Sequence, residues 1–136
     1  MSAAQNLIYA TVQVAHNLGA VAVVGGSLGG TLLKNPETRK NLAWLALAGW
    51  AAQALSGATF GAVSHYFYGK FPDIGEIATA ALLLKMTCAA AGFILLAVYL
   101  TRSANWPDRK RNGAWHASAA LAVTALSAAA FLRWFS

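Results

Sequence analysis

Apolar residues in this chain fall into four long stretches separated by short polar links. Three of the stretches contain no Asp, Glu, Lys or Arg, and the other contains a single charge; they are 7–33, 41–69, 77–101 and 112–132. A helix of about 20 apolar residues is long enough to cross the hydrocarbon core of a bilayer. The pattern therefore predicts four transmembrane helices, near 6–33, 41–68, 75–101 and 112–134.

The links between the predicted helices are short, so helices adjacent in sequence are expected to be adjacent in space. We expect an all-α membrane protein, a four-transmembrane-helix up-down bundle that forms one domain over residues 1–136. Composition agrees, because 58% of the residues are hydrophobic, 10% are charged and the mean hydropathy is +0.52. A soluble domain of this size leaves too much surface exposed to hide so many apolar residues.

The basic residues predict the orientation in the membrane. Seven lie in the links 34–40 and 102–111, whereas only Lys70 and Arg133 lie at the opposite end. By the positive-inside rule, both links face the cytoplasm and both termini face outward, as expected for a protein of a bacterial inner membrane. The residues before the first span carry no Lys or Arg, so we do not expect a cleaved signal peptide. The basic residues form no single surface, which argues against a nucleic-acid partner and leaves the lipid bilayer as the expected surrounding.

Aromatic residues near the predicted helix ends are interpreted as anchors at the membrane interface. Those expected on the inner side are Trp44, Tyr99, Trp106 and Trp115, and those on the outer side are Tyr9, Tyr66, Tyr68 and Trp134. In the outer link, Asp73 stands three residues before Glu76. This spacing predicts a capping box that opens the third helix.

Lys85 is the first candidate for a functional site, because an ionisable side chain at the centre of a span costs about 3 kcal/mol or more. With a rise of about 1.5 Å per residue, Lys85 and His16 each lie about 15 Å below the outer ends of their helices. Gln53 reaches a similar level in the second helix, and Thr124 and Ser127 do so in the fourth. We expect a polar layer in which Lys85 points into the bundle and meets His16 or Gln53. This layer is either a ligand-binding site formed by His16, Lys85 and Gln53 or a structural hydrogen-bond network.

Metal and cofactor chemistry is more weakly indicated. The axial ligands of a haem must lie at one depth, but His65 lies about 10 Å nearer the outer end than His16, and His116 begins the last helix at the other end. A bis-histidine haem b therefore needs a ligand from a partner subunit. Copper prefers Cys, Met and His, and Cys88 lies on the same side of its helix as Lys85. The candidate metal ligands are thus His16 and Cys88.

Three short motifs mark the first three spans. They are His16 leading into Gly25-Gly26, Ser56-Gly57, and Leu83-Leu84-Lys85. Together they resemble the copper resistance D (CopD/PcoD-like) family of integral membrane proteins, over residues 14–131. Two positions depart from the family pattern: Val24 replaces an aromatic residue, and Tyr68-Gly69 lies farther from the lysine. By this resemblance, the histidine and the lysine of the motifs form the family's polar pair, and the expected role is copper uptake or service as a subunit of a larger complex.

Three functions remain open from the sequence. The first is a non-enzymatic subunit or binding module with a polar His/Lys site, acting with a partner membrane subunit or as a homo-oligomer. The second is copper transport across the inner membrane, which the lack of clustered soft ligands weakens. The third is a haem b or quinone-linked electron-transfer subunit. No set of nucleophile, base and orienting residue is recognisable, so we do not predict an enzyme.

Overall fold

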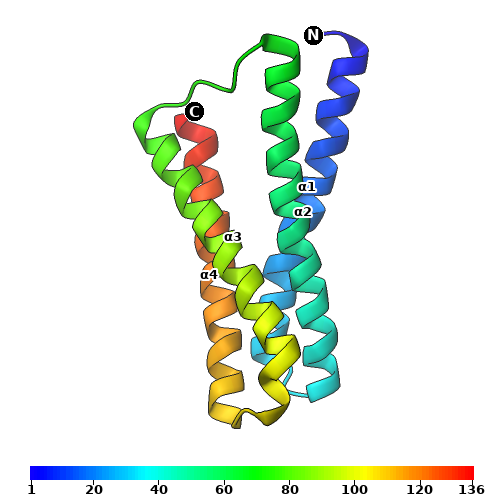
Figure 1. Cartoon of the computed structure of the whole chain (residues 1–136), viewed down its shortest axis with the longest axis vertical. Helices are drawn as coiled ribbons and strands as arrows, with labels where there is room; N and C mark the ends of the chain where they lie inside the picture. The colour runs from blue at the N-terminus through cyan, green and yellow to red at the C-terminus, as the bar shows by residue number, and fades with distance from the viewer.

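The computed structural model describes all 136 residues, of which 89% are helical, and it contains no strand. A short 3-10 turn, η1, precedes the last of the four helices. The elements are α1 (Ala3–Leu32), α2 (Pro36–Tyr68), α3 (Glu76–Arg102), η1 (Ser103–Asn105) and α4 (Asp108–Phe135). The helices run alternately up and down along one axis, and both termini lie at the same end (Figure 1). The predicted all-α fold with four helices is confirmed.

Three of the four helices, α1, α3 and α4, are long and apolar enough to cross a membrane. The remaining helix, α2, is the longest at 33 residues but does not meet this standard. Its first turn is charged, and its interior carries polar residues that include Gln53 and Ser56. A polar residue that packs inside a bundle lowers the hydropathy of its helix without exposing a polar group to lipid.

Two helices begin earlier than the hydropathy predicts. α2 begins at Pro36 rather than 41, because the side chain of Asn35 accepts hydrogen bonds from the N–H groups of Glu37 and Thr38, at 3.0 and 3.1 Å. Such an N-cap followed by proline is a favourable helix start. α4 likewise begins at Asp108 rather than 112. Hydropathy identifies the apolar part of a helix and misses a charged first turn.

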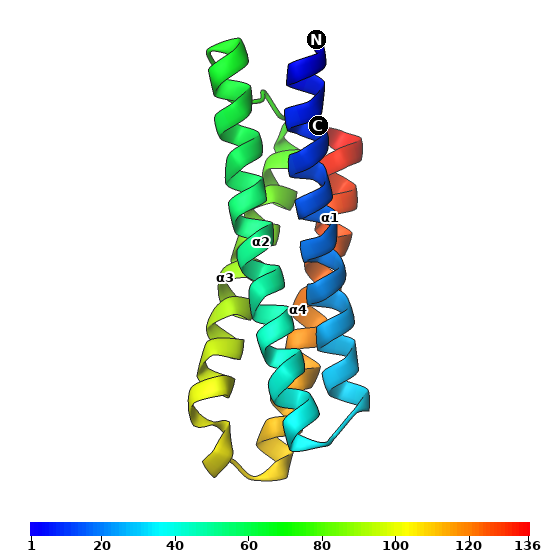
Figure 2. The same ribbon diagram turned by 90° about the vertical axis from the view of Figure 1, so that its right-hand side faces the viewer.

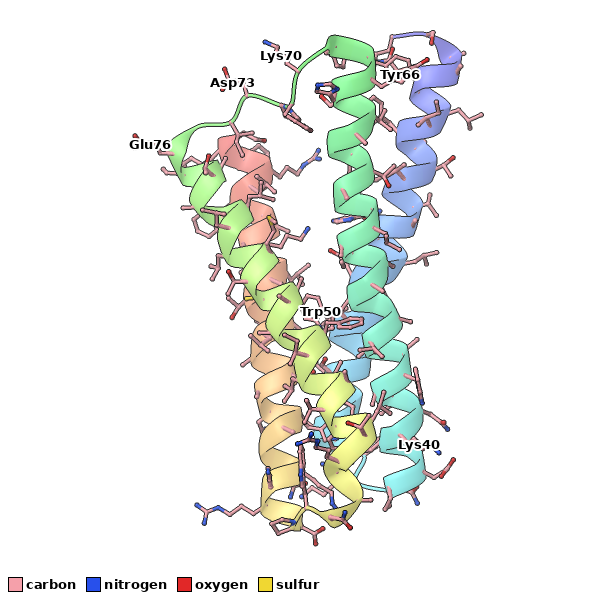
Figure 3. The ribbon with its side chains drawn as sticks, viewed as in Figure 1. Lys40, Trp50, Tyr66, Lys70, Asp73 and Glu76 are labelled. Atoms are coloured by element: carbon pink, nitrogen blue, oxygen red, sulfur yellow. The ribbon has the colours of Figure 1, made fainter.

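The predicted capping box at the start of α3 is wrong. The N-cap is Gly75, and no side chain bonds to the first turn. Glu76 is the first helical residue rather than the third, so Asp73 lies too far outside the helix to cap it. Both carboxylates point away from the bundle (Figure 3).

The bundle consists of two antiparallel helix pairs, α1 with α2 and α3 with α4. Glycines bring the backbones of the first pair close together: a Cβ atom on Gly49 would lie 2.8 Å from the carbonyl oxygen of Gly19. The two pairs lie together at the end that holds the short links and diverge toward the end that holds the termini (Figure 1). The point at which they separate determines which residues from different pairs can meet.

Two tryptophans join the helix pairs by packing against glycines. Trp50 points from α2 toward α3 (Figure 3) and covers Gly92, where a Cβ atom would lie 2.5 Å from the indole. Trp115 of α4 covers Gly30 of α1 in the same way, with a corresponding distance of 2.0 Å. Both indoles are almost fully buried. These two contacts hold the helix pairs together in the half of the bundle that contains the short links.

The aromatic residues near the helix ends therefore have two different roles. Trp115 and Tyr99 were expected at the membrane interface, but both are buried, and their rings meet edge to face at 5.2 Å. The prediction is wrong for these two, because proximity to a helix end does not decide whether a ring faces lipid or a neighbouring helix. Trp44, Tyr66 and Trp134 are exposed, as an interfacial anchor requires.

Candidate functional site

Lys85 lies on α3 and reaches across to α1. Its Nζ atom is 2.9 Å from Nε2 of His16, within hydrogen-bonding distance. The predicted contact between these residues, 69 positions apart in sequence, is therefore present. Lys85 is half-buried and points into the bundle rather than toward lipid.

His16 is held by α2 through its backbone as well as its ring. Gly19, one turn farther along α1, allows α2 to approach, and Gln53 lies beside it. The side-chain amide of Gln53 donates a hydrogen bond to the backbone carbonyl of His16. Of the two partners predicted for Lys85, His16 and Gln53, only His16 makes the contact, because the amide of Gln53 is used in fixing the helix that carries the histidine.

Ser56 completes the cluster and indicates which nitrogen of the ring carries the proton. Its hydroxyl donates to the carbonyl oxygen of Ala52 at 2.6 Å, and Nδ1 of His16 lies 2.6 Å from the same hydroxyl oxygen. Because a hydroxyl has one hydrogen, its oxygen is left to accept from the Nδ1–H of the ring. Nε2 of the neutral imidazole is then the acceptor for the lysine ammonium. The donations run in one direction, from Lys85 to His16 to Ser56 to the backbone.

The charge of Lys85 has no acidic partner in this chain. The four carboxylates, Glu37, Asp73, Glu76 and Asp108, all lie in links or first helical turns. The only ion pair is between Arg111 and Asp108, at the far end of the bundle. An ammonium carries three N–H donors, and the single protein partner of Lys85 uses one of them. The lysine therefore retains donor capacity and uncompensated charge.

Aromatic side chains form one wall of the site. Phe60 of α2 meets the ring of His16 edge to face, with the centroids 5.8 Å apart, and Tyr9 stacks on Phe60 at 6.3 Å. These contacts restrict rotation of the imidazole. The resulting site has a rigid acceptor in His16, a flexible cation in Lys85 and an apolar wall beside them.

The fourth helix does not contribute to the polar layer. Thr124 and Ser127 are exposed, and the hydroxyl of Ser127 donates to the carbonyl oxygen of Val123 in its own helix. The buried face of α4 is instead a row of small residues. The prediction that Thr124 and Ser127 join the layer is wrong, because equal depth does not imply that a residue faces inward.

The structure gives little support to a metal centre. It contains no group of three or more His, Cys, Asp or Glu side chains that could hold a metal ion. Cys88 is buried and free, but both ring nitrogens of His16 are already used. A metal at His16 and Cys88 would have to displace Lys85 or Ser56 and take further ligands from outside this chain. His65 and His116 are exposed and belong to other regions.

Three hydrogen-bonding serines were not among the predicted site residues. Ser56 lies three residues after Gln53, so the helical spacing that places Gln53 inside also places Ser56 there. Farther down the bundle, Ser27 of α1 and Ser118 of α4 are fully buried, with their hydroxyl oxygens 2.8 Å apart. That second pair joins the two helix pairs and has no charged member.

No family model, no curated protein and no solved structure matches this chain. The resemblance to the CopD family therefore rests on its three short motifs and stays a prediction. What the structure adds is that the histidine and the lysine of those motifs are in contact.

Proposed function

We propose that this chain is a four-span integral membrane protein of a bacterial inner membrane, with both termini outside. Three helices have the length and apolarity to cross a bilayer. α2 packs against α1 along its length and lacks charged residues from 41 to 69, which supports a fourth crossing. The basic links lie together at the end opposite the termini (Figure 1), which supports a cytoplasmic location for that end.

The function that this geometry supports best is non-enzymatic binding of a small ligand by Lys85 and its neighbours, with the chain acting as a membrane-embedded binding module or subunit. The observation that carries the proposal is the half-buried lysine, which has unused N–H donors and no carboxylate partner. Charged groups inside a membrane are costly and are therefore candidates for function. A ligand that offers an acceptor oxygen to the ammonium would offset that cost.

Among the open alternatives, a quinone fits the residues better than copper or haem. Its carbonyl oxygen can accept from the free N–H donors of Lys85, and its ring can lie against the aromatic wall at Phe60. Copper and haem iron would require His16 to release one of its two hydrogen-bond partners. A structural network without a ligand is the competing explanation, and it makes a different prediction for a variant that lacks the charge.

The test compares Lys85→Met with Lys70→Met, which removes the same charge from an exposed link. Protein purified in mild detergent is analysed for extracted quinone by mass spectrometry, for haem by its optical spectrum and for copper by metal analysis. We expect Lys85→Met to lose quinone binding about tenfold or more, because a hydrogen bond to a charged donor is lost. Lys70→Met should bind as wild type does.

Stability separates the site from a structural network. A flexible apolar side chain in place of a buried charge is often neutral or stabilising, so Lys85→Met should remain folded. A variant that unfolds in detergent, with residual binding proportional to the folded fraction, would support the structural network instead. A variant that is stable and binds normally would show that Lys85 is dispensable. Detection of copper or haem in the wild-type protein but not in Lys85→Met would favour the copper or haem alternative.

A further inference from the structure

A second polar region lies at the opposite end of the bundle from the termini, far from Lys85. The link between α1 and α2 and the η1 turn between α3 and α4 lie there side by side (Figures 1 and 2). Between them is a hollow of about 370 Å³. This volume is within the range of small-molecule sites in proteins, whose lower limit is about 300 Å³. The charged residues that line it are Lys34, Glu37, Arg39, Lys40, Asp108 and Arg111.

The charge of this hollow is positive. Four cations and two carboxylates line it, which gives a net charge of +2. Asp108 is already close to Arg111, at 3.7 Å, and Arg111 also donates to the carbonyl oxygen of Trp106 through two nitrogens. The guanidinium of Arg111 is therefore already paired with protein groups. The first turns of α2 and α4 lie at this end together with the last turns of α1 and α3, so the helix dipoles oppose one another and the net positive charge of the side chains is what favours an anion.

Arg39 distinguishes the hollow from an ordinary basic membrane surface. This residue, in the first turns of α2, is 5% exposed, although cationic side chains are rarely so fully buried without a charged partner. Its Nε donates to the carbonyl oxygen of Gly30, in the last turn of α1, at 2.9 Å. Its two terminal nitrogens have no protein hydrogen-bond partner, and no carboxylate lies within ion-pairing distance. The guanidinium is thus held in place by one nitrogen while its paired donors remain unused.

Tyr99 provides a second donor of the same kind. It is also 5% exposed, it lines the hollow, and its hydroxyl makes no hydrogen bond with the protein. The ring is fixed between Trp106 and Trp115, with centroid distances of 6.1 and 5.2 Å. Two side chains that line one hollow therefore keep donors without a protein partner, and a single acceptor group in the hollow can bond to both.

We propose that this hollow binds a phosphate group. The two terminal nitrogens of Arg39 donate to it as a bidentate pair, and the Tyr99 hydroxyl is a further donor. A planar guanidinium matches the spacing of phosphate oxygens, and the pair is stronger than one between neutral groups. The phosphate belongs to an anionic phospholipid or to a soluble phosphorylated compound. The helix ends that form the hollow lie at the level at which lipid headgroups meet a four-span bundle.

The experiment uses the full chain and has two arms. Both are run at one fixed ionic strength, because a change in salt concentration would by itself change the attraction between charged groups. In the first, nanodiscs of phosphatidylcholine are prepared with and without phosphatidylglycerol, and the lipid that remains after detergent extraction is measured by mass spectrometry. In the second, inorganic phosphate is titrated into protein in neutral detergent by calorimetry. Retention of phosphatidylglycerol alone identifies a lipid headgroup, and binding of inorganic phosphate identifies a soluble ligand; either supports the site.

The variants are Arg39→Gln, Tyr99→Phe and the control Arg102→Gln, which removes a charge from the same end at an exposed residue that does not line the hollow. We expect Arg39→Gln to weaken binding about tenfold or more and Arg102→Gln to have less than about a twofold effect. Tyr99→Phe leaves the contact of Arg39 with Gly30 intact, so it tests the site even where Arg39→Gln fails to fold. Equal binding by wild type, Arg39→Gln and Tyr99→Phe would overturn the proposal, as would equal losses for Arg39→Gln and Arg102→Gln. So would the absence of binding in both arms.

Discussion

Replacement of Gly92 by alanine tests how the two helix pairs are joined. The added Cβ atom would lie 2.5 Å from the indole of Trp50, whereas carbon atoms in favourable contact are about 3.5–4.0 Å apart. Either α3 moves away from α2 by about 1 Å or the indole leaves its place. Extra atoms in a packed core cost about 1–3 kcal/mol, and loss of a helical glycine returns up to about 1 kcal/mol. We expect a net loss of about 1–2 kcal/mol.

The measurement is the free energy of unfolding from titration of the purified protein with a denaturing detergent in mixed micelles. Gly25→Ala is the matched control, because nothing lies within 4 Å of a Cβ atom at that helical glycine. The control should be neutral or slightly stabilised. A smaller side chain at Trp50, as in Trp50→Leu combined with Gly92→Ala, should cost less than the sum of the single changes, because the two sites are in contact. Equal stabilities for Gly92→Ala and Gly25→Ala would refute the packing of Trp50 on Gly92.

Two further predictions concern the buried serines and the topology. Ser27→Ala or Ser118→Ala should each destabilise the protein by about 0.6 kcal/mol and at most about 1.7 kcal/mol, as for other hydrogen bonds between membrane helices. The double variant should lose little more than either single variant; additive losses in the same unfolding assay would show that the hydroxyl groups are not partners. Reporter fusions at Ser136 and within 103–108 should report opposite sides of the membrane, and the same side for both would contradict the proposed four-span topology.

The fold was largely predictable, because helix length and order depend on properties that are local in the sequence. Long uncharged stretches separated by short links are sufficient to predict four antiparallel helices. The orientation of each helix about its own axis is less accessible, since it depends on side chains from neighbouring helices. Trp115 shows the difference: its position near a helix end is local, whereas its burial depends on the absence of a side chain at Gly30.

The site was predictable only in part for the same reason. A lone lysine in an apolar span must find a partner inside the bundle, and depth restricted the choice to a few residues. Depth identified His16 correctly and Thr124 and Ser127 wrongly. It does not distinguish a residue on the inward face from one that is rotated toward lipid. Ser56, which shares a face with Gln53, would have been found by helical spacing rather than by depth.

His16 is fixed by more partners than Lys85, and this difference determines which kind of ligand the site can bind. The imidazole is fixed by Ser56, by packing against Phe60, and by Gln53, which bonds to its backbone. Lys85 is fixed by His16 alone. A ligand with an acceptor oxygen would therefore compete for, or share, the hydrogens of Lys85 and leave His16 in place. A ligand that must bind the ring nitrogens would instead disrupt several contacts at once, and for this reason the geometry favours an oxygen acceptor over a metal ion at this site.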